Sequence, residues 1–168
     1  SLYRDMPESA EVMHDSTIAG LEKFLADRAG FYDVIWIGRT HNFDDVTKTI
    51  QSAIAGAQTR PRIVLDTEAI ASVRDAVRSA IPGQEQPFDL KEALAREFAN
   101  GEYCDDIVAV SPAEAKQLRG LGYNRVSVIG HQRAITPAPA AFDARAGLLF
   151  VGAVREMNSP NYDGLCWF

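Results

Sequence analysis

The sequence predicts an α/β protein with a parallel β-sheet flanked by helices. Short apolar runs alternate with longer stretches of helical periodicity, which is typical of successive right-handed βαβ units. The runs are nearly continuous in apolar residues, a pattern of strands that are covered on both faces. The predicted strands are YDVIWIG (32–38), RIVLD (62–66), DDIVAVS (105–111), RVSVIG (125–130) and LLFVG (148–152).

Two helices are predicted around the first strong strand. Asp15 or Ser16 caps the first helix, which ends at Gly30, and the segment AEVMH (10–14) before it is a weaker edge strand. Asn42 precedes the second helix, whose first turn is acidic and therefore suits the positive end of a helix dipole. An apolar stripe with a spacing of mostly four residues supports this second helix.

Three further helices precede the last strand. One runs over 68–80 and stops at Ile-Pro-Gly, and another begins near Phe88 and ends before Gly101. The clearest start is SPAE (111–114), which has serine as the cap, proline at the first helical position and glutamate at the third. Capping accounts for these residues, so we assign them no chemistry.

A linker is predicted after the fourth strong strand. The segment HQRAITPAPAAFDARAG is rich in alanine and proline, and it follows a strand where a helix is expected. We therefore expect a first domain over 1–130, a linker over 131–146, and the first strand and helix start of a second domain over 147–168. Ser159 and Pro160 mark that helix start.

Composition predicts a soluble cytoplasmic protein. Hydrophobic residues make up 46% of the chain, and no apolar run approaches the roughly 18 residues of a membrane span. The 23 acidic and 17 basic residues give a net charge of −6, which argues against a nucleic-acid partner. Cys104 and Cys166 form no CxxC or metal-binding spacing and are expected to be reduced thiols.

Candidate ligand-binding residues follow the predicted strands, because open α/β sheets bind ligands beyond the carboxyl ends of their strands. After the first strong strand, Arg39 could hold a phosphate or carboxylate and His41 could act as an acid or base. The alternative is a polar loop in which Asn42 caps the next helix. Both interpretations of this loop stay open.

Asp66 and Glu68 follow the second strong strand. Carboxylates at this position can accept hydrogen bonds from sugar hydroxyls or take a proton from an acceptor. Arg74 lies on the following helix. The alternative is that Asp66 caps this helix, Glu68 lies in its first turn, and Arg74 is exposed or ion-paired.

Gly152 and Arg155 follow the last predicted strand. A glycine there lets the backbone approach a ligand closely, and the next helix N-terminus offers amide groups to an anion such as a diphosphate. The chain contains no glycine-rich dinucleotide or P-loop motif, no GxSxG and no HExxH. We therefore expect no metal site and no nicotinamide chemistry.

Four stretches together resemble group 1 glycosyltransferases, which have the GT-B architecture of two Rossmann-like domains. The resemblance covers residues 11 to 168, and the fourth stretch is its most specific part. The stretches are FYDVIWIGRTH, PRIVLDTEAIASVRD, CDDIVAVSPAEAKQLRGLGYNRVSVIGH and GLLFVGAVREMNSPNYDGLCWF.

This resemblance implies transfer of a sugar from a nucleotide-diphosphate sugar to a saccharide or lipid-linked acceptor, with no cofactor. Acceptor contacts are expected in GRTH and DTEA, with Glu68 and His41 in catalytic roles and three residues binding substrate: Arg39, Asp66 and Arg74. Gly152 resembles the glycine near the donor diphosphate, and Arg155 is a looser match. Lipid-linked acceptors imply peripheral membrane contact of the parent protein.

The family pattern is incomplete in this chain. Its first strand should precede AEVMH, and its Glu-x7-Glu motif and basic phosphate contacts should follow Phe168. We therefore expect an internal fragment that is inactive alone, with an apolar tail (147–168) that promotes self-association. The alternative is a non-catalytic Rossmann-like binding or scaffold module. A receiver-like domain is disfavoured because the expected late lysine is missing.

Overall fold

The structure is a computed structural model, and it divides into two compact units, Ser1–His131 and Gln132–Phe168. The division falls one residue after the predicted end of the first domain. The predicted linker lies largely outside the residues that the structure describes, which are 6–13, 17–83, 85–130, 141–154, 157 and 159–168.

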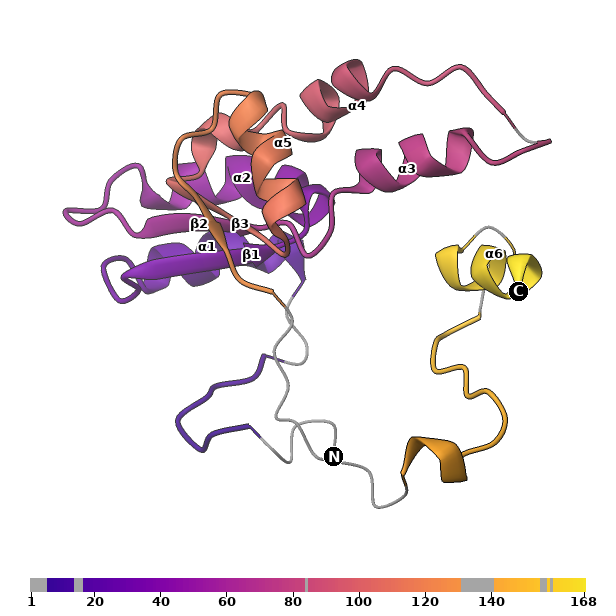
Figure 1. The fold of residues 1–168 in the computed structure, drawn as a ribbon. Coiled ribbons are helices and arrows are strands. Elements are labelled where there is room, and N and C mark those ends of the chain that lie inside the picture. Colours follow the sequence, from indigo (N-terminus) through magenta and orange to yellow (C-terminus); the bar gives the residue numbers. More distant parts are fainter. Residues whose placement is uncertain (1–5, 14–16, 84, 131–140, 155–156, 158) are drawn as a thin grey trace. The chain divides into compact units, whose positions relative to one another are not determined.

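The first unit contains a four-stranded parallel sheet in the order β1-β2-β3-β4, which confirms the predicted α/β class (Figure 1). In the register of the sheet, Trp36 lies beside Val64, and Val64 lies beside Asp106. Each strand therefore neighbours the strand that precedes it in the chain. The strands are β1 (Val34–Gly38), β2 (Arg62–Asp66), β3 (Asp106–Ala109) and β4 (Val126–Val128).

The strands are shorter than the apolar runs that predict them. Hydrogen-bond pairing between neighbours, and not apolar character, sets their ends, so β3 stops at Ala109 although the predicted run continues to Ser111. The predicted edge strand over 10–14 is wrong for residues 10–13, which have no strand assignment. Those residues pair with no described strand.

Five α-helices and a short 3-10 helix are described in the first unit, and several begin where the sequence predicts. The Ser111 hydroxyl accepts from the Glu114 amide at 3.2 Å, and the Asp89 carboxylate accepts from the Glu92 amide at 3.0 Å, so both helices are capped by side chains. The helices are α1 (Ile18–Asp27), α2 (Thr40–Ile54), α3 (Ala71–Ser79), α4 (Leu90–Glu97), η1 (Gly101–Tyr103) and α5 (Pro112–Gly120).

Two helix starts differ from the prediction. Helix α2 begins at Thr40, so Asn42 lies inside its first turn, where its amide donates to the Gly38 carbonyl at 2.8 Å. Helix α3 begins only at Ala71, three residues after the predicted start at Glu68. The contacts that delay α3 belong to the candidate site described below.

Helix α2 packs against β1 and β2 and helix α5 against β3 and β4, whereas α1 packs mainly on α2 and α3 mainly on α4. Because the strand order follows the chain, each right-handed crossover returns on the same side. The side chains of this single core come from alternate strand positions and from the helices: Leu25, Ile37, Phe43, Ile50, Ile63, Leu65, Ile70, Leu94, Phe98, Ile107, Ala109, Ala115, Leu118 and Val126.

The opposite face of the sheet is open at its edge. Val34 and Trp36 of β1 are 49% and 51% exposed there, whereas Val64 and Val108 of the central strands are buried. The expectation that the strands are covered on both faces is therefore wrong for β1 within the described part of the chain. Continuous apolar runs do not distinguish a covered face from an open one.

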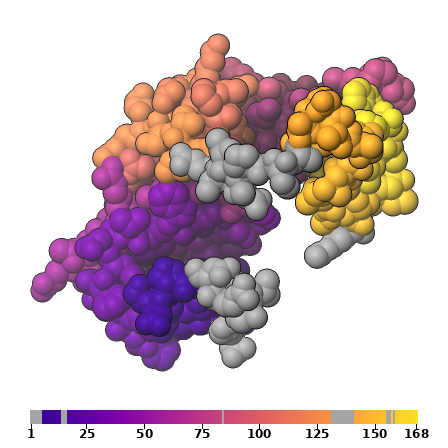
Figure 2. Space-filling model, turned by 60° about the horizontal axis from the view of Figure 1, so that its bottom comes forward, coloured from indigo at the N-terminus to yellow at the C-terminus, as the bar shows by residue number. Residues whose placement is uncertain are grey.

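Residues 6–13 form no helix or strand and lie on the surface of the first unit (indigo in Figure 2). The Arg28 guanidinium holds this segment through two hydrogen bonds to the Glu11 carboxylate, at 2.9 and 3.0 Å. Arg28 also donates to the Tyr32 hydroxyl at 2.6 Å and stacks over Phe24. The segment is thus attached at the end of α1.

The second unit contains η2 (Phe142–Ala144) and α6 (Pro160–Trp167), and Ser159 caps α6 as predicted. The predicted strand over 148–152 is wrong, because these residues have no strand assignment. A strand requires a hydrogen-bonded neighbour, and the described part of this unit offers none. The apolar side chains of the tail are largely exposed, as expected; they include Leu148, Trp167 and Phe168.

A search of the described helices for membrane spans finds none long and apolar enough to cross a bilayer.

We predict that Leu118→Ala destabilises the first unit by about 2–5 kcal/mol, because Leu118 is fully buried and its truncation leaves a cavity. Val77→Ala is the matched control, since Val77 is 70% exposed on α3 and should change stability by less than about 0.5 kcal/mol. Urea denaturation monitored by circular dichroism measures both. Equal effects of the two substitutions would contradict the core described above.

Candidate functional site

Arg39 and Glu68 meet at the carboxyl edge of β1 and β2. The Arg39 Nε donates to the Glu68 Oε2 at 2.7 Å, and both side chains are about half exposed. The sheet register explains this meeting, because it places Gly38 beside Asp66 and so brings the residues after each strand together. Two residues predicted from sequence thus form one site.

The backbone at this site is strained. Arg39 has φ 73° and ψ 140°, and Glu68 has φ 51°, and these are the only non-glycine residues with positive φ among the described residues. Side chains with a Cβ rarely adopt such conformations, which cost of order 1–3 kcal/mol each. Strain of this kind concentrates at functional sites, and here both strained residues belong to one ion pair.

Hydrogen bonds from the strand ends hold the strained residues in place. The Arg39 amide donates to the Asp66 carbonyl at 2.7 Å, and the Glu68 amide donates to the Asp66 carboxylate at 3.0 Å. The other carboxylate oxygen of Asp66 accepts from the Trp36 indole at 3.2 Å. Gly38 completes the site, because a Cβ there would lie 2.6 Å from the Glu68 carboxylate.

Two carboxylates from distant helices fix the loop that follows β2. Glu97 of α4 accepts from the amides of Ala71 and Ser72 at 2.8 and 2.7 Å, at the N-terminus of α3. It also accepts from the Thr40 hydroxyl at 3.1 Å, which links this loop to the start of α2. A carboxylate at this end of a helix is favoured by the helix dipole.

Glu114 of α5 binds the same loop from the other side. Its carboxylate accepts from the Thr67 hydroxyl at 3.3 Å, from the Ile70 amide at 3.2 Å and from the Val110 amide at 3.4 Å. The interpretation that capping alone explains Glu114 is therefore incomplete. Because Glu97 and Glu114 supply the acceptors, α3 begins at Ala71 and Asp66 does not cap it.

His41 and Arg74 do not join the Arg39–Glu68 pair. His41 is exposed in the first turn of α2, and no hydrogen bond or ion pair connects it with Glu68 among the residues described. Arg74 is exposed on α3 and pairs with its neighbour Asp75 at 3.5 Å. The structure thus brings together Arg39, Asp66 and Glu68.

Gly152 lies in the second unit, and Arg155 lies outside the described residues. A Cβ at Gly152 would approach the Phe150 ring at 2.8 Å and the Asn161 amide at 3.0 Å. Asn161 donates to the Ala153 carbonyl at 2.9 Å, so it holds this turn against α6. The close approach at Gly152 is therefore made by the chain's own side chains.

The site combines one cation with two acceptor groups. The terminal nitrogens of Arg39 make no hydrogen bond with any residue in the described ranges, so they can bind an anion. The carboxylates of Asp66 and Glu68 can accept from hydroxyl groups. No cluster of three potential metal ligands occurs in the part of the chain that was searched.

Trp36, Gly38 and Glu97 contribute to the site but were not singled out from the sequence. Trp36 and Gly38 belong to a predicted strand, and alternation along that strand could have placed both on the face opposite the helices. Glu97 has no local signal, because its partners lie 25 and more residues away in sequence. Only the packing of α4 against α3 brings it to the loop.

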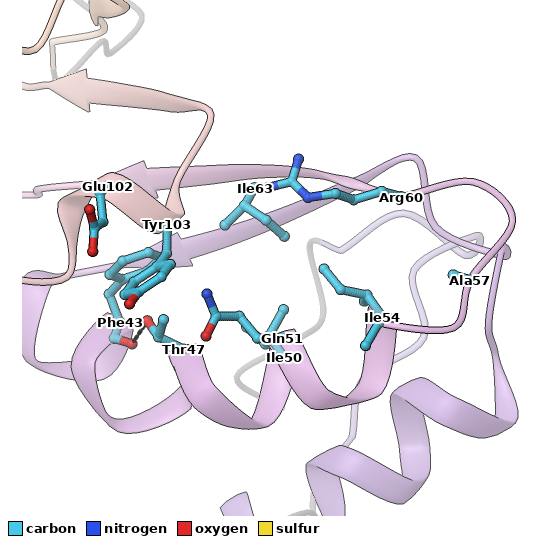
Figure 3. Close-up of a pocket in the computed structure, with 11 residues that line it drawn as sticks. Phe43, Thr47, Ile50, Gln51, Ile54, Ala57, Arg60, Ile63, Glu102 and Tyr103 are labelled. Atoms are coloured by element: carbon cyan, nitrogen blue, oxygen red, sulfur yellow. Dashed lines mark hydrogen bonds between the residues drawn. The ribbon is translucent and has the colours of Figure 1, made fainter.

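A pocket of about 430 Å³ lies at the other end of the sheet, between α2 and η1 (Figure 3). Phe43, Ile50, Ile54 and Ile63 form most of its apolar wall, with Tyr103 from η1. None of the predicted site residues lines it. We therefore assign the candidate site to the carboxyl edge of the sheet and not to this pocket.

Ion pairs connect the amino ends of the strands. Arg62 binds the Asp106 carboxylate through two hydrogen bonds, and Arg125 approaches the same carboxylate at 3.6 Å. The hydrogen bond from Arg62 is the largest cause that lowers the pKa of Asp106 below its usual range. The same bond raises the pKa of Arg62.

Asp105 forms a second ion pair, with Arg60 just before β2. Arg60 donates to both of its carboxylate oxygens, at 2.8 and 2.7 Å, and the Ile63 amide donates to one of them at 2.7 Å. Desolvation by itself would raise the pKa of Asp105, but these hydrogen bonds outweigh it and hold the pKa below its usual range.

We predict that these aspartates make the fold sensitive to acid. Their pKa values are lower in the folded than in the unfolded state, so the stabilisation is complete above about pH 4 and is lost as pH falls through the folded-state values. Asp106→Asn should therefore destabilise the protein at about pH 7 and have a smaller effect at about pH 3. Urea denaturation at both pH values tests this, with Glu22→Gln on α1 as the control.

We also predict that Arg39→Gly raises the free energy of unfolding by about 1 kcal/mol, because glycine tolerates the positive φ and loses only an exposed ion pair. Arg39→Ala removes the same ion pair but keeps the Cβ, so it should leave stability unchanged or slightly lower. Urea denaturation compares the two variants. Equal stability of the glycine and alanine variants would show that the backbone at Arg39 is not strained.

Comparison of the chain with protein-family models, with curated proteins and with solved structures finds no match in any of the three. The fold class therefore rests on the sheet and its helices, and the candidate site rests on its own contacts. These contacts are the basis for the proposal that follows.

Proposed function

We propose that this chain is the acceptor-side part of a glycosyltransferase that moves a sugar from a nucleotide-diphosphate sugar to a saccharide or lipid-linked acceptor. The observation that carries the proposal is the ion pair of Arg39 with Glu68, in which both residues have a strained backbone. The pair joins the two loops, GRTH and DTEA, that resemble the acceptor loops of group 1 glycosyltransferases.

The chemistry of the site suits an acceptor hydroxyl. In the proposed transfer, the hydroxyl oxygen attacks the anomeric carbon of the donor, the diphosphate leaves, and the hydroxyl proton passes to a base. Glu68 is the proposed base, because its carboxylate is exposed and lies at the edge of the sheet. Asp66 accepts from a neighbouring hydroxyl, and Arg39 binds an anionic group of the acceptor or donor.

Four predicted residues have supporting roles in this proposal. His41 is exposed two residues after Arg39 and is the proposed second acid–base group. Arg74, which is exposed on α3, is a proposed substrate-binding residue. Gly152, with Arg155 beyond it in sequence, contributes to the donor diphosphate site of the second unit, next to the N-terminus of α6.

The test is a transfer assay on the natural protein that contains this sequence. Donors are UDP-glucose, UDP-N-acetylglucosamine and GDP-mannose, each with a panel of saccharide and lipid-linked acceptors. We expect Glu68→Gln to lower kcat by about 10²–10⁴-fold, because it removes the base, and Arg39→Ala to raise the acceptor KM. Glu22→Gln, an exposed change on α1, is the control and should leave both constants unchanged.

The 168-residue chain alone is expected to turn over no nucleotide sugar, because the described part of its second unit contains no strand of a donor-binding sheet. Turnover by this chain would contradict its assignment as an acceptor-side part. Full activity of the Glu68→Gln variant in the natural protein would remove Glu68 as the base. Absence of transfer with every donor would favour a binding module instead.

A further inference from the structure

Strand β1 forms one edge of the sheet, and most of its outward backbone groups make no hydrogen bond with any described residue. The Asp33 carbonyl accepts from the Arg62 amide at 2.8 Å, and the Arg39 amide donates to the Asp66 carbonyl at 2.7 Å, so the odd-numbered residues face β2. Val34, Trp36 and Gly38 therefore direct their backbone groups outward. Only the Gly38 carbonyl has a partner there within the described ranges, the Asn42 amide.

Strand β1 lacks the features that prevent edge strands from pairing with strands of other chains. The sequence Val-Ile-Trp-Ile-Gly contains no charge, no proline and no bulge. The side chains of Val34 and Trp36 are about half exposed on the sheet face that the helices leave open. An uncharged edge with apolar neighbours is a template for pairing with another strand.

We propose that β1 pairs antiparallel with β1 of a second copy of this chain, about a two-fold axis at Trp36. In this register the amide and carbonyl of Trp36 exchange two hydrogen bonds with Trp36 of the partner subunit. Val34 then lies opposite Gly38 of the partner subunit. This inference goes beyond the proposed function and does not depend on it.

Charge at the two ends of β1 favours the antiparallel arrangement. Asp33 precedes Val34 at the amino end of the strand and Arg39 follows Gly38 at the carboxyl end, and both residues are exposed. Antiparallel pairing about Trp36 places Asp33 of each copy opposite Arg39 of the partner subunit, and a parallel pairing would bring like charges together. The surface is therefore complementary to itself, as a two-fold interface requires.

Trp36 is the expected anchor of this interface. Its indole is oriented by the hydrogen bond to Asp66, so little conformational freedom remains to be lost on pairing. Large aromatic residues at the centre of an interface contribute most of its affinity. With only a short strand on each side, we expect a dissociation constant of about 10–100 µM.

The test is size-exclusion chromatography with light scattering over about 5–500 µM protein, a range that brackets the expected dissociation constant. We expect a monomer–dimer equilibrium in the wild type and a weakening of at least about tenfold in Trp36→Lys. Trp167→Lys is the matched control, because Trp167 is 88% exposed on the tail that the sequence predicts to self-associate. This control variant should dimerise like the wild type.

Three results would overturn the proposal: a wild-type monomer at every concentration, a dimer lost in Trp167→Lys but kept in Trp36→Lys, or a dimer that both variants keep. A wild-type monomer would indicate that β1 pairs with a strand of another polypeptide segment and not with a second copy of this chain. Circular dichroism shows whether the Trp36→Lys variant is folded.

Amide hydrogen exchange of the wild-type protein tests the register without any substitution. The amides of Val34, Trp36 and Gly38 should become at least about tenfold more protected as the protein concentration rises through the dissociation constant. The amides of Ile35 and Ile37, which already bond to β2, should change little. Protection that rises equally at all five positions, or only in α6, would exclude pairing through β1.

Discussion

The parallel pairing of β1 with β2 is the constraint on which the rest of the first unit depends. It ends with the Arg39 amide bonded to the Asp66 carbonyl, and the chain leaves the strand at Arg39 with a positive φ. The same register sets Glu68 over Gly38, where its carboxylate meets the Arg39 guanidinium. The strained ion pair is thus a direct consequence of how two strands align.

The packing of the helices then makes this arrangement rigid. Glu97 from α4 and Glu114 from α5 accept from backbone amides of the loop after β2, and both carboxylates come from elements that follow the loop in the chain. A loop held by two helices can keep an unfavourable backbone conformation at Glu68, because the cost is offset by several charge-assisted hydrogen bonds. Fold and candidate site therefore share the same interactions.

The arrangement of the helices on one side of the sheet bears on the proposed pairing of β1 with a second copy of the chain. Because each crossover returns on the same face, β1 has an open edge and an exposed tryptophan on the other face. The site and this edge adjoin at Gly38 and Asp66. A second strand bound to β1 would therefore lie next to the Arg39–Glu68 ion pair. The charged residues that define the site would also orient that second strand.

Local patterns in the sequence predicted the α/β class, the four strands of the sheet and the capped starts of α5 and α6, because these depend on local periodicity and on side chains within one turn. These patterns also placed Arg39, Asp66 and Glu68 at the carboxyl edge of the sheet, since each follows the end of a predicted strand. Tertiary packing set the other features. It brings Glu97 and Glu114 to the loop after β2, and it therefore makes α3 start at Ala71. It also leaves the segment over 148–152 without a described neighbour to pair with, and one face of β1 uncovered by the described residues. Those outcomes depend on contacts between residues far apart in the chain, which leave no local pattern in the sequence.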